Sequence, residues 1–205
     1  MNKDFFLDQK FLDGEMLPYE RFKLYTWISE IKPKVVFEVG TGTGGGSTFF
    51  IASAILNMKL NSTIYTCDPS RSPTKEFLDE FESVKFYRNF SNIVIPDLIN
   101  NEISPDFIMF DGPEDPMIAY NDLIYLEKYI SNDTYFCMHD WDEYRNYDNS
   151  RSTKSVKVRE YIENSLNWTL VEKLDANIKN SNFDNWEYDS VGLCLYKFKK
   201  NNNYE

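Results

Sequence analysis

The chain has 205 residues, of which 42% are hydrophobic and 17% aromatic, values typical of a folded domain with a full core. Its 22 basic residues against 33 acidic ones give a net charge of −11, and no run of Lys and Arg forms a basic patch, so we expect no nucleic-acid partner. The sequence shows neither a signal peptide nor an apolar run long enough to span a membrane, so we expect a cytoplasmic protein with no membrane partner.

Helix-like and strand-like patterns alternate along the chain. Helices are expected at 19–31, 47–58, 73–81, 93–99, 117–130 and 154–164, with Ser72 as the N-cap and Pro73 as the first residue of the third. Strands are expected at 34–39, 63–67, 84–87, 106–110, 134–138, 169–174 and 191–198, and residues 141–151 read as a loop.

This alternation predicts an α/β fold with a parallel sheet covered by helices on both faces. Because no helical pattern separates the last two strands, we expect them to pair antiparallel. The prediction is a Rossmann-like doubly wound seven-stranded sheet with the last strand antiparallel. With no linker or repeat, we expect one domain over residues 1–205, made of an N-terminal helical cap at 1–32 and a Rossmann-like core at 33–199.

Three cysteines, Cys67, Cys137 and Cys194, fall within expected strands. Their spacing fits no metal-binding motif. We therefore expect small buried side chains in a protein of a reducing compartment.

A glycine-rich turn follows the first expected strand, in the segment Val35-Val36-Phe37-Glu38-Val39-Gly40-Thr41-Gly42-Thr43-Gly44-Gly45-Gly46. Such a turn brings backbone N–H groups close to a ligand at the N-terminus of the next helix. The pattern Gly40-x-Gly42-x-x-Gly45 also satisfies the dinucleotide fingerprint, but the carboxylate of Glu38 would repel a neighbouring pyrophosphate. Glu38 instead suits a ligand that carries an ammonium group and a sulfonium.

Acidic residues lie at the carboxyl ends of four of the expected strands: Glu38, Asp68, Asp111 and Asp140. In doubly wound sheets, ligands bind beyond the carboxyl ends of the strands, where the strand order reverses. Asp68 lies where a carboxylate can accept hydrogen bonds from ribose hydroxyls, although Asp-Pro-Ser also suits a helix cap or a turn.

The segment Glu38-Val39-Gly40-Thr41-Gly42-Thr43-Gly44 resembles the first motif of class I S-adenosylmethionine-dependent methyltransferases, acidic-x-Gly-x-Gly-x-Gly. Residues 84–98 are similar to the corresponding strand and helix start of catechol-type O-methyltransferases. Residues 106–123 and Met138-His139-Asp140 resemble the macrocin-type and related sugar O-methyltransferases. Altogether the resemblance covers about Lys34 to Asp140.

The resemblance implies S-adenosyl-L-methionine as the cofactor, with the glycine turn against its methionine portion and Glu38 near its amino group. Ser91 would lie beside the adenine. The implied cofactor-binding residues are Glu38, Gly40, Thr41, Gly42, Gly44, Asp68, Ser91 and Asp111.

The resemblance also implies a metal, because in those relatives the carboxylates that match Asp111 and Asp140 help to hold a divalent ion. Mg²⁺ would suit these hard oxygens and lower the pKa of an acceptor hydroxyl. The chain departs from the family pattern at Glu114, Pro116 and Trp141, which stand for a histidine, a tyrosine and an amide ligand. Whether the protein needs Mg²⁺ therefore stays open, and Asp142 could substitute for the amide ligand that Trp141 replaces.

The implied catalytic residues are Asp111, Glu114 and His139. His139 is the only histidine and could act as a general base, or it could be a core residue or a metal neighbour. Glu114 is the other candidate base, placed by the alignment beside Asp111.

We therefore expect methyl transfer to a hydroxyl of a small, polyhydroxylated acceptor such as a sugar or a glycan precursor. Aromatic and polar segments at 5–17, 141–147 and 177–188 would recognise it, or else anchor loops or form a homodimer interface. An NAD-dependent oxidoreductase is a second reading, disfavoured by Glu38, the reversed last strand and the lack of a Tyr-x-x-x-Lys pair. A non-catalytic S-adenosylmethionine-binding protein is a third, suggested by the altered Asp-Gly-Pro-Glu motif.

Overall fold

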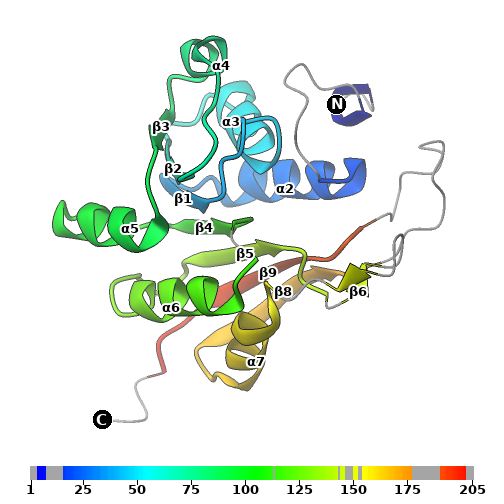
Figure 1. The fold of residues 1–205 in the computed structure, drawn as a ribbon, viewed down its shortest axis with the longest axis vertical. Helices are drawn as coiled ribbons and strands as arrows, with labels where there is room; N and C mark the ends of the chain where they lie inside the picture. The colour runs from blue at the N-terminus through cyan, green and yellow to red at the C-terminus, as the bar shows by residue number, and fades with distance from the viewer. Residues whose placement is uncertain are drawn as a thin grey trace.

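A seven-stranded sheet carries helices on both faces (Figure 1). The computed structural model describes residues 4–7, 16–112, 114–142, 144–145, 150–151, 154–176 and 190–201. Its helices are α1 (Asp4–Leu7), α2 (Pro18–Ile31), α3 (Ser47–Asn57), α4 (Lys75–Glu80), α5 (Ser91–Asn100), α6 (Pro116–Leu126) and α7 (Val156–Asn164). Its strands are β1 (Val35–Val39), β2 (Thr63–Cys67), β3 (Val84–Tyr87), β4 (Phe107–Phe110), β5 (Tyr135–His139), β6 (Tyr144–Arg145), β7 (Ser150–Arg151), β8 (Trp168–Leu174) and β9 (Leu193–Phe198).

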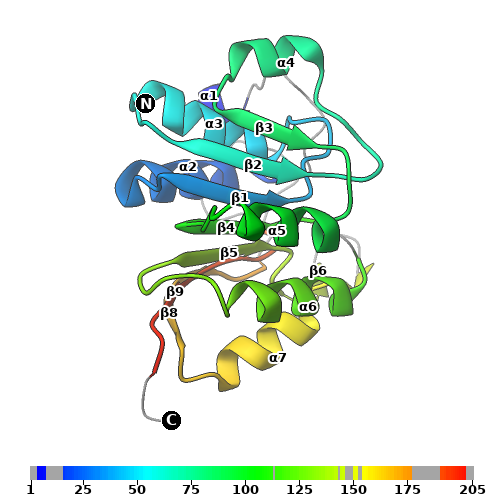
Figure 2. The same cartoon turned by 90° about the vertical axis from the view of Figure 1, so that its left-hand side faces the viewer.

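The strand order in the sheet is β3-β2-β1-β4-β5-β9-β8, which confirms the predicted doubly wound fold. Strands β1 to β5 pair in parallel, and β9 runs antiparallel to both β5 and β8. Figure 2 shows the arrows of β1, β2 and β3 pointing to the same side of the molecule. The order reverses between β1 and β4, and the register Val39↔Phe110 brings the ends of these two strands level.

Two hydrophobic clusters hold the helices onto the sheet, one on each face. Side chains alternate along each strand, so Val36 and Met109 pack against the first face, with α2 and α3, while Phe37 and Ile108 pack against the second, with α5, α6 and α7. Strand β4 is buried along its whole length, as a central parallel strand must be. The three cysteines are buried and free, as expected.

The structure corrects three local predictions. Helix α4 begins at Lys75, after Pro73, because its N-cap is Thr74, whose hydroxyl accepts a hydrogen bond from the Phe77 N–H at 3.2 Å, rather than Ser72. Helix α5 begins at Ser91, so Pro96 lies inside it. Part of the segment predicted as a loop at 141–151 pairs as the short antiparallel strands β6 and β7.

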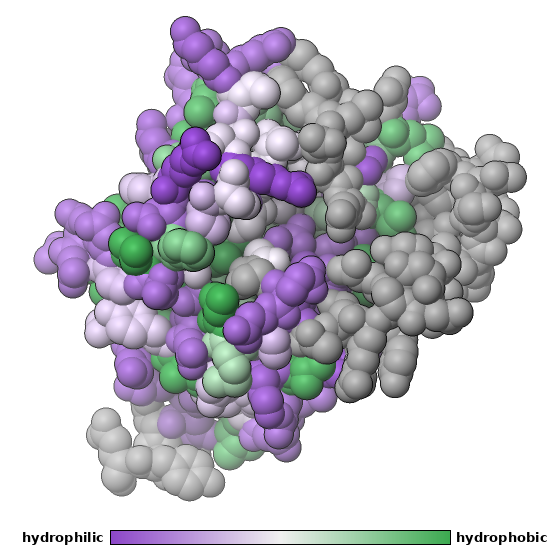
Figure 3. Space-filling view, in the orientation of Figure 1, coloured by the Kyte–Doolittle hydropathy of each residue, from purple (hydrophilic) through white to green (hydrophobic). Residues whose placement is uncertain are grey.

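The face seen in Figure 3 is mainly hydrophilic, with apolar residues dispersed over it. Among the helices that the structure describes, none is both long and apolar enough to cross a membrane.

Candidate active site

The glycine turn brings the ends of β1 and β4 into close contact. Gly40 has φ +101°, and a Cβ added there would lie 2.2 Å from the carbonyl oxygen of Asp111, so no residue with a side chain fits this position without moving the backbone. The Gly40 N–H donates to the Cys67 carbonyl at 2.9 Å, and the Asp111 N–H donates to the Val39 carbonyl at 2.8 Å. Glycine at this position therefore sets how closely Asp111 approaches the turn.

Glu38 is fully buried beneath the turn and anchors the start of α3. One of its oxygens accepts a hydrogen bond from the Ser47 hydroxyl at 2.6 Å, and the other accepts from the hydroxyls of Thr48 at 2.7 Å and Thr66 at 2.6 Å. Burial raises the pKa of Glu38 to about 7 although all three hydrogen bonds oppose the shift. Glu38 thus joins β1, β2 and α3 below the site.

Asp68 fixes the turn from the end of β2. Its Oδ2 accepts from the Gly42 N–H at 3.0 Å, while its Oδ1 accepts from the N–H groups of Ser70 and Arg71, both at 2.8 Å. Partial burial would raise the pKa of Asp68, but these backbone donors outweigh it and hold the pKa below its usual value. Asp68 is therefore a carboxylate at neutral pH.

A pocket of about 480 Å³ opens at the point where the strand order reverses. The predicted residues that line it are Gly40, Thr41, Gly42, Asp68, Ser91, Asp111, Glu114 and Asp140. Of the other predicted residues, Glu38, Gly44 and His139 are not among those that line it, whereas the unpredicted residues Ser47, Phe90 and Lys154 are. The glycine turn, the strand ends and the family resemblance together therefore predict most of the residues of one pocket wall.

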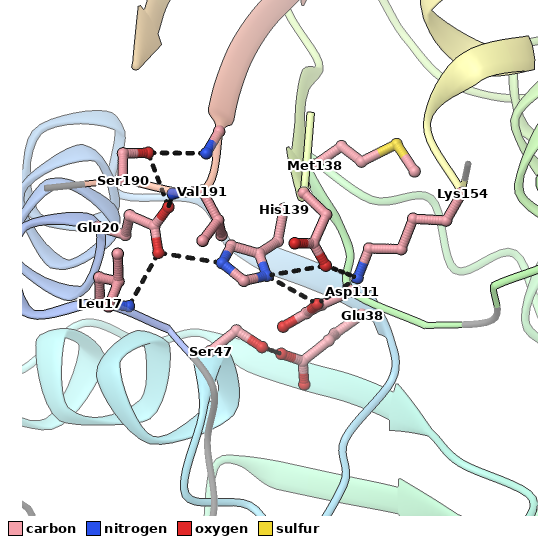
Figure 4. A network of polar contacts seen from close by, with 12 residues as sticks. Leu17, Glu20, Glu38, Ser47, Asp111, Met138, His139, Lys154, Ser190 and Val191 are labelled. Atoms are coloured by element: carbon pink, nitrogen blue, oxygen red, sulfur yellow. Dashed lines mark hydrogen bonds and ion pairs between the residues drawn. The ribbon is translucent and has the colours of Figure 1, made fainter. Parts of the chain in front are cut away.

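A cluster of charged side chains joins the ends of β4 and β5 to α7 (Figure 4). The Lys154 Nζ lies 2.9 Å from Asp111 Oδ1 and 2.6 Å from Asp140 Oδ2. The His139 Nδ1 lies 3.1 Å from Asp111 Oδ1 and 3.7 Å from Asp140 Oδ2. Asp140 has φ +52°, a left-handed conformation that is uncommon for a residue with a side chain.

Glu20 extends the cluster to α2 and to the start of β9. One of its oxygens lies 3.0 Å from the His139 Nε2 and accepts from the Leu17 N–H at 2.8 Å. The other accepts from the Ser190 hydroxyl and the Val191 N–H, both at 2.7 Å. Figure 4 shows His139 between Glu20 and Asp111. The side chain of Glu20 has no exposed surface, so it acts as an internal cross-link.

These contacts set the protonation of the cluster. Burial would lower the pKa of His139, but Asp111 and Glu20 outweigh it and hold the pKa well above its usual value. Burial likewise opposes the charge on Lys154, yet Asp111 and Asp140 raise its pKa. Burial would raise the pKa values of Asp111 and Asp140, but the two neighbouring cations keep both below the usual range. Asp111 and Asp140 are therefore ionised beside two cations.

A family model described as a methyltransferase domain matches residues 37–141, just over half of the chain. The chain belongs to this methyltransferase family. The matched residues include the glycine turn and the ends of β2, β4 and β5 that form the pocket. A search of the curated proteins found no match.

Solved structures share the fold of this methyltransferase at low sequence identity. An O-methyltransferase from Bacillus cereus in complex with SAH is 16% identical with a TM-score of 0.65, covering 92% of this chain and 84% of that one. SAH-bound PaMTH1 from Podospora anserina is 14% identical with a TM-score of 0.63, covering 88% and 78%. The O-methyltransferase TomG from Streptomyces achromogenes, which takes part in tomaymycin synthesis and was solved with SAM, is 14% identical with a TM-score of 0.63, covering 88% and 80%.

Two residues of the charged cluster in the methyltransferase site, Glu20 and Lys154, were not predicted from the sequence. Glu20 lies one helical turn before the buried Leu24, on the inner stripe of α2, and this position was the available signal for a buried carboxylate. Lys154 precedes α7, where the helix dipole disfavours a cation, so a lysine there was a weak signal for an acidic partner. Neither signal identifies the partner, because Asp111, His139 and Asp140 are distant in the chain.

The carboxylate cluster of the methyltransferase offers the donor types that a divalent ion needs. One ligand atom from each of Asp111, His139 and Asp140 lies within 4.8 Å of the others. The Lys154 ammonium, however, already contacts the two carboxylate oxygens that face each other. The His139 Nδ1 lies 3.1 Å from Asp111 Oδ1 and its Nε2 lies 3.0 Å from Glu20 Oε2, so each ring nitrogen has a carboxylate partner, an arrangement that favours an N–H rather than a free lone pair at Nδ1. In this conformation the residues do not fit Mg²⁺.

Proposed function

We propose that this methyltransferase takes its methyl group from S-adenosyl-L-methionine and transfers it to a hydroxyl of a small molecule. One observation carries the proposal: the glycine turn, Asp68, Ser91 and Asp111 line a single pocket where the strand order reverses. Its volume of about 480 Å³ is that of a small-molecule site. The SAH and SAM held by the similar structures support the same ligand class.

The cofactor would lie along the wall formed by β1, β2 and α5. Oδ2 of Asp68 accepts only the Gly42 N–H among the described residues, which leaves it a lone pair for a ribose hydroxyl. Phe90 is 58% exposed and lines the pocket next to Ser91, so its ring is available to stack on an adenine. Ser47 lines the pocket, and its hydroxyl donates a hydrogen bond to Glu38. Glu38 would therefore act on the cofactor's amino group through Ser47.

When bound, S-adenosylmethionine supplies a methyl group that is already electrophilic. The chain must then align an acceptor oxygen with that methyl and remove its proton. Asp111 and Glu114 line the pocket, and we assign Glu114 as the base and Asp111 as the group that holds the acceptor. His139 has both ring nitrogens within hydrogen-bond distance of carboxylates, so we assign it a positioning role through Asp111.

The acceptor proposed is polyhydroxylated, such as a sugar or a glycan precursor. Carboxylates of Asp111, Glu114 and Asp140 and the ammonium of Lys154 share the pocket wall, and this mixture of acceptors and donors matches several hydroxyls at once. Of the segments predicted to recognise the acceptor, 177–188 lies outside the described residues, as do most of 5–17 and residues 143, 146 and 147 of the segment 141–147. The single domain over 1–205, the homodimer and the cytoplasmic location stay predictions.

Calorimetry with S-adenosylmethionine, S-adenosylhomocysteine and NAD tests the cofactor, and we expect both sulfur ligands to bind and NAD not to bind. A radiolabelled methyl-transfer screen over nucleotide sugars, catechols and glycans then tests the acceptor. Binding of NAD alone would overturn the proposal in favour of an oxidoreductase. Binding of the sulfur ligands without transfer to any hydroxyl would favour a binding protein.

A further inference from the structure

We propose that Lys154 takes the place of a metal ion in this site, so that the methyltransferase holds its acceptor with an ammonium of its own chain. The inference rests on the proposed function for the acceptor contact, but not for the prediction about metal binding. The Lys154 Nζ lies 2.9 Å from Asp111 Oδ1 and 2.6 Å from Asp140 Oδ2.

The ammonium is buried rather than a mobile surface charge. The side chain of Lys154 is 4% exposed, and that of Asp140 is equally buried. A lysine so far from water is stable as a cation only where carboxylates compensate for its lost hydration. The positive charge that compensates the carboxylates of Asp111 and Asp140 is thus supplied by a side chain of the protein itself.

A divalent ion and the ammonium would compete for the same place. Mg²⁺ binds oxygen at about 2.0–2.1 Å, so an ion held by Asp111 Oδ1 and Asp140 Oδ2 would fall on the Lys154 Nζ or in contact with it. Two cations at that distance repel each other strongly in a buried site. Metal binding would require Lys154 to leave both of its partners.

The backbone around Lys154 is fixed independently of these ion pairs. The hydroxyl of Ser155 donates to the Trp141 carbonyl at 2.8 Å, and a guanidinium nitrogen of Arg159 donates to the same carbonyl at 3.1 Å. Trp141 directly follows Asp140, so the start of α7 is tied to the residue next to the carboxylate. This attachment holds Lys154 at the pocket even when its ion pairs loosen.

The geometry also leaves the ammonium a donor for the acceptor. An ammonium carries three N–H donors, and in the described part of the chain Lys154 contacts two partners, Asp111 and Asp140. Lys154 also lines the pocket. We infer that the third N–H donates a hydrogen bond to an oxygen of the acceptor. Lys154 would then orient the acceptor, as a metal ion would otherwise do.

The first experiment measures Mn²⁺ binding by electron paramagnetic resonance on the metal-free wild-type protein, at Mn²⁺ up to millimolar concentration. We expect no saturable site that involves Asp111. An Mn²⁺ site in the wild type that is lost in Asp111→Asn would overturn the proposal. This readout needs neither cofactor nor acceptor, so it stands even if S-adenosylmethionine fails to bind and the proposed function fails.

The second experiment uses Lys154→Met, with Lys157→Met as the matched control, because Lys157 is an exposed lysine in the first turn of α7, close to Lys154 in the chain. We expect Lys154→Met to lower kcat/KM about 10- to 100-fold, as for the loss of one charge-assisted hydrogen bond, and to gain Mn²⁺ binding. Lys157→Met should do neither. If Lys154→Met does not fold, the wild-type assay in EDTA decides: full transfer supports the proposal, and loss restored by Mg²⁺ overturns it.

Discussion

Asp68 follows β2 and Asp111 follows β4, the two strands that flank β1, but we assign them different roles. Asp111 faces the charged cluster and Asp68 faces the glycine turn. We expect Asp111→Ala to abolish methyl transfer while S-adenosylmethionine affinity stays within about tenfold, and Asp68→Ala to weaken that affinity at least about tenfold through a lost charged hydrogen bond. Calorimetry together with a transfer assay measures both effects. The reverse pattern would show that the two roles are exchanged.

Glu38 is a buried acid whose pKa is raised to about 7 from its ordinary 4.5. Between these values the folded chain holds a proton that the unfolded chain has released, so Glu38 makes the free energy of unfolding fall as pH rises from about 4.5 to about 7. We expect Glu38→Gln to remove this slope in the ligand-free protein. Urea titrations at several pH values measure it.

Glu30→Gln is the control for Glu38→Gln, since it makes the same change of side chain at an exposed position of α2. An unchanged slope in Glu38→Gln would mean that Glu38 does not titrate in that window.

Among the elements, α2 has a function beyond covering the sheet. Through Glu20 it holds both His139 at the end of β5 and the backbone that enters β9. We expect Glu20→Gln to lower the free energy of unfolding by about 1–3 kcal/mol, because the amide can satisfy fewer of the four donors around that carboxylate. Urea unfolding measures the change, and Glu30→Gln on the exposed face of the same helix should stay within about 0.5 kcal/mol. Equal effects of the two variants would contradict the cross-link.

Element boundaries show which signals in the sequence were sufficient. The sequence pattern predicts β1 to β5 to within one residue, because short runs rich in β-branched and aromatic residues are followed closely by Gly, Asp or, after β3, Asn89. Helix α4 was misplaced because Ser72 and Thr74 are both suitable N-caps, and only the fold selects Thr74. The pairing of β6 with β7 was missed because strands of two residues carry no periodicity.

For the whole molecule, the topology and the position of the pocket followed from the strand ends, because parallel strands carry their last residues to one edge. The charged cluster did not follow, because Glu20 reaches it from α2, far away in the chain, and Lys154 reaches it from the segment before α7. Their role depends on tertiary contacts that no local pattern encodes. The departure at Glu114 from the family pattern became interpretable only with Glu114 placed on the pocket wall.

Ligand binding should stabilise the whole chain, since the pocket joins the ends of β1, β2, β4 and β5. At 100 times its Kd, a ligand that binds only the folded state adds about 2.7 kcal/mol. For about 200 residues we expect S-adenosylhomocysteine to raise Tm by about 5–10 °C under that condition, as measured by calorimetry. NAD at the same concentration should leave Tm unchanged, and a larger shift with NAD would contradict the assigned cofactor.

The reversed direction of β9 has a consequence for how acceptor preference could diversify. Because β9 runs against β5 while β8 runs with it, the last described residue after β8, Ala176, and the first before β9, Ser190, both belong to the edge that carries the pocket. Both ends of the connection between β8 and β9 are thus fixed on the pocket side, so we expect exchange of residues 177–189 between relatives to change acceptor choice while the strand pairing, the glycine turn and the cofactor site stay as they are.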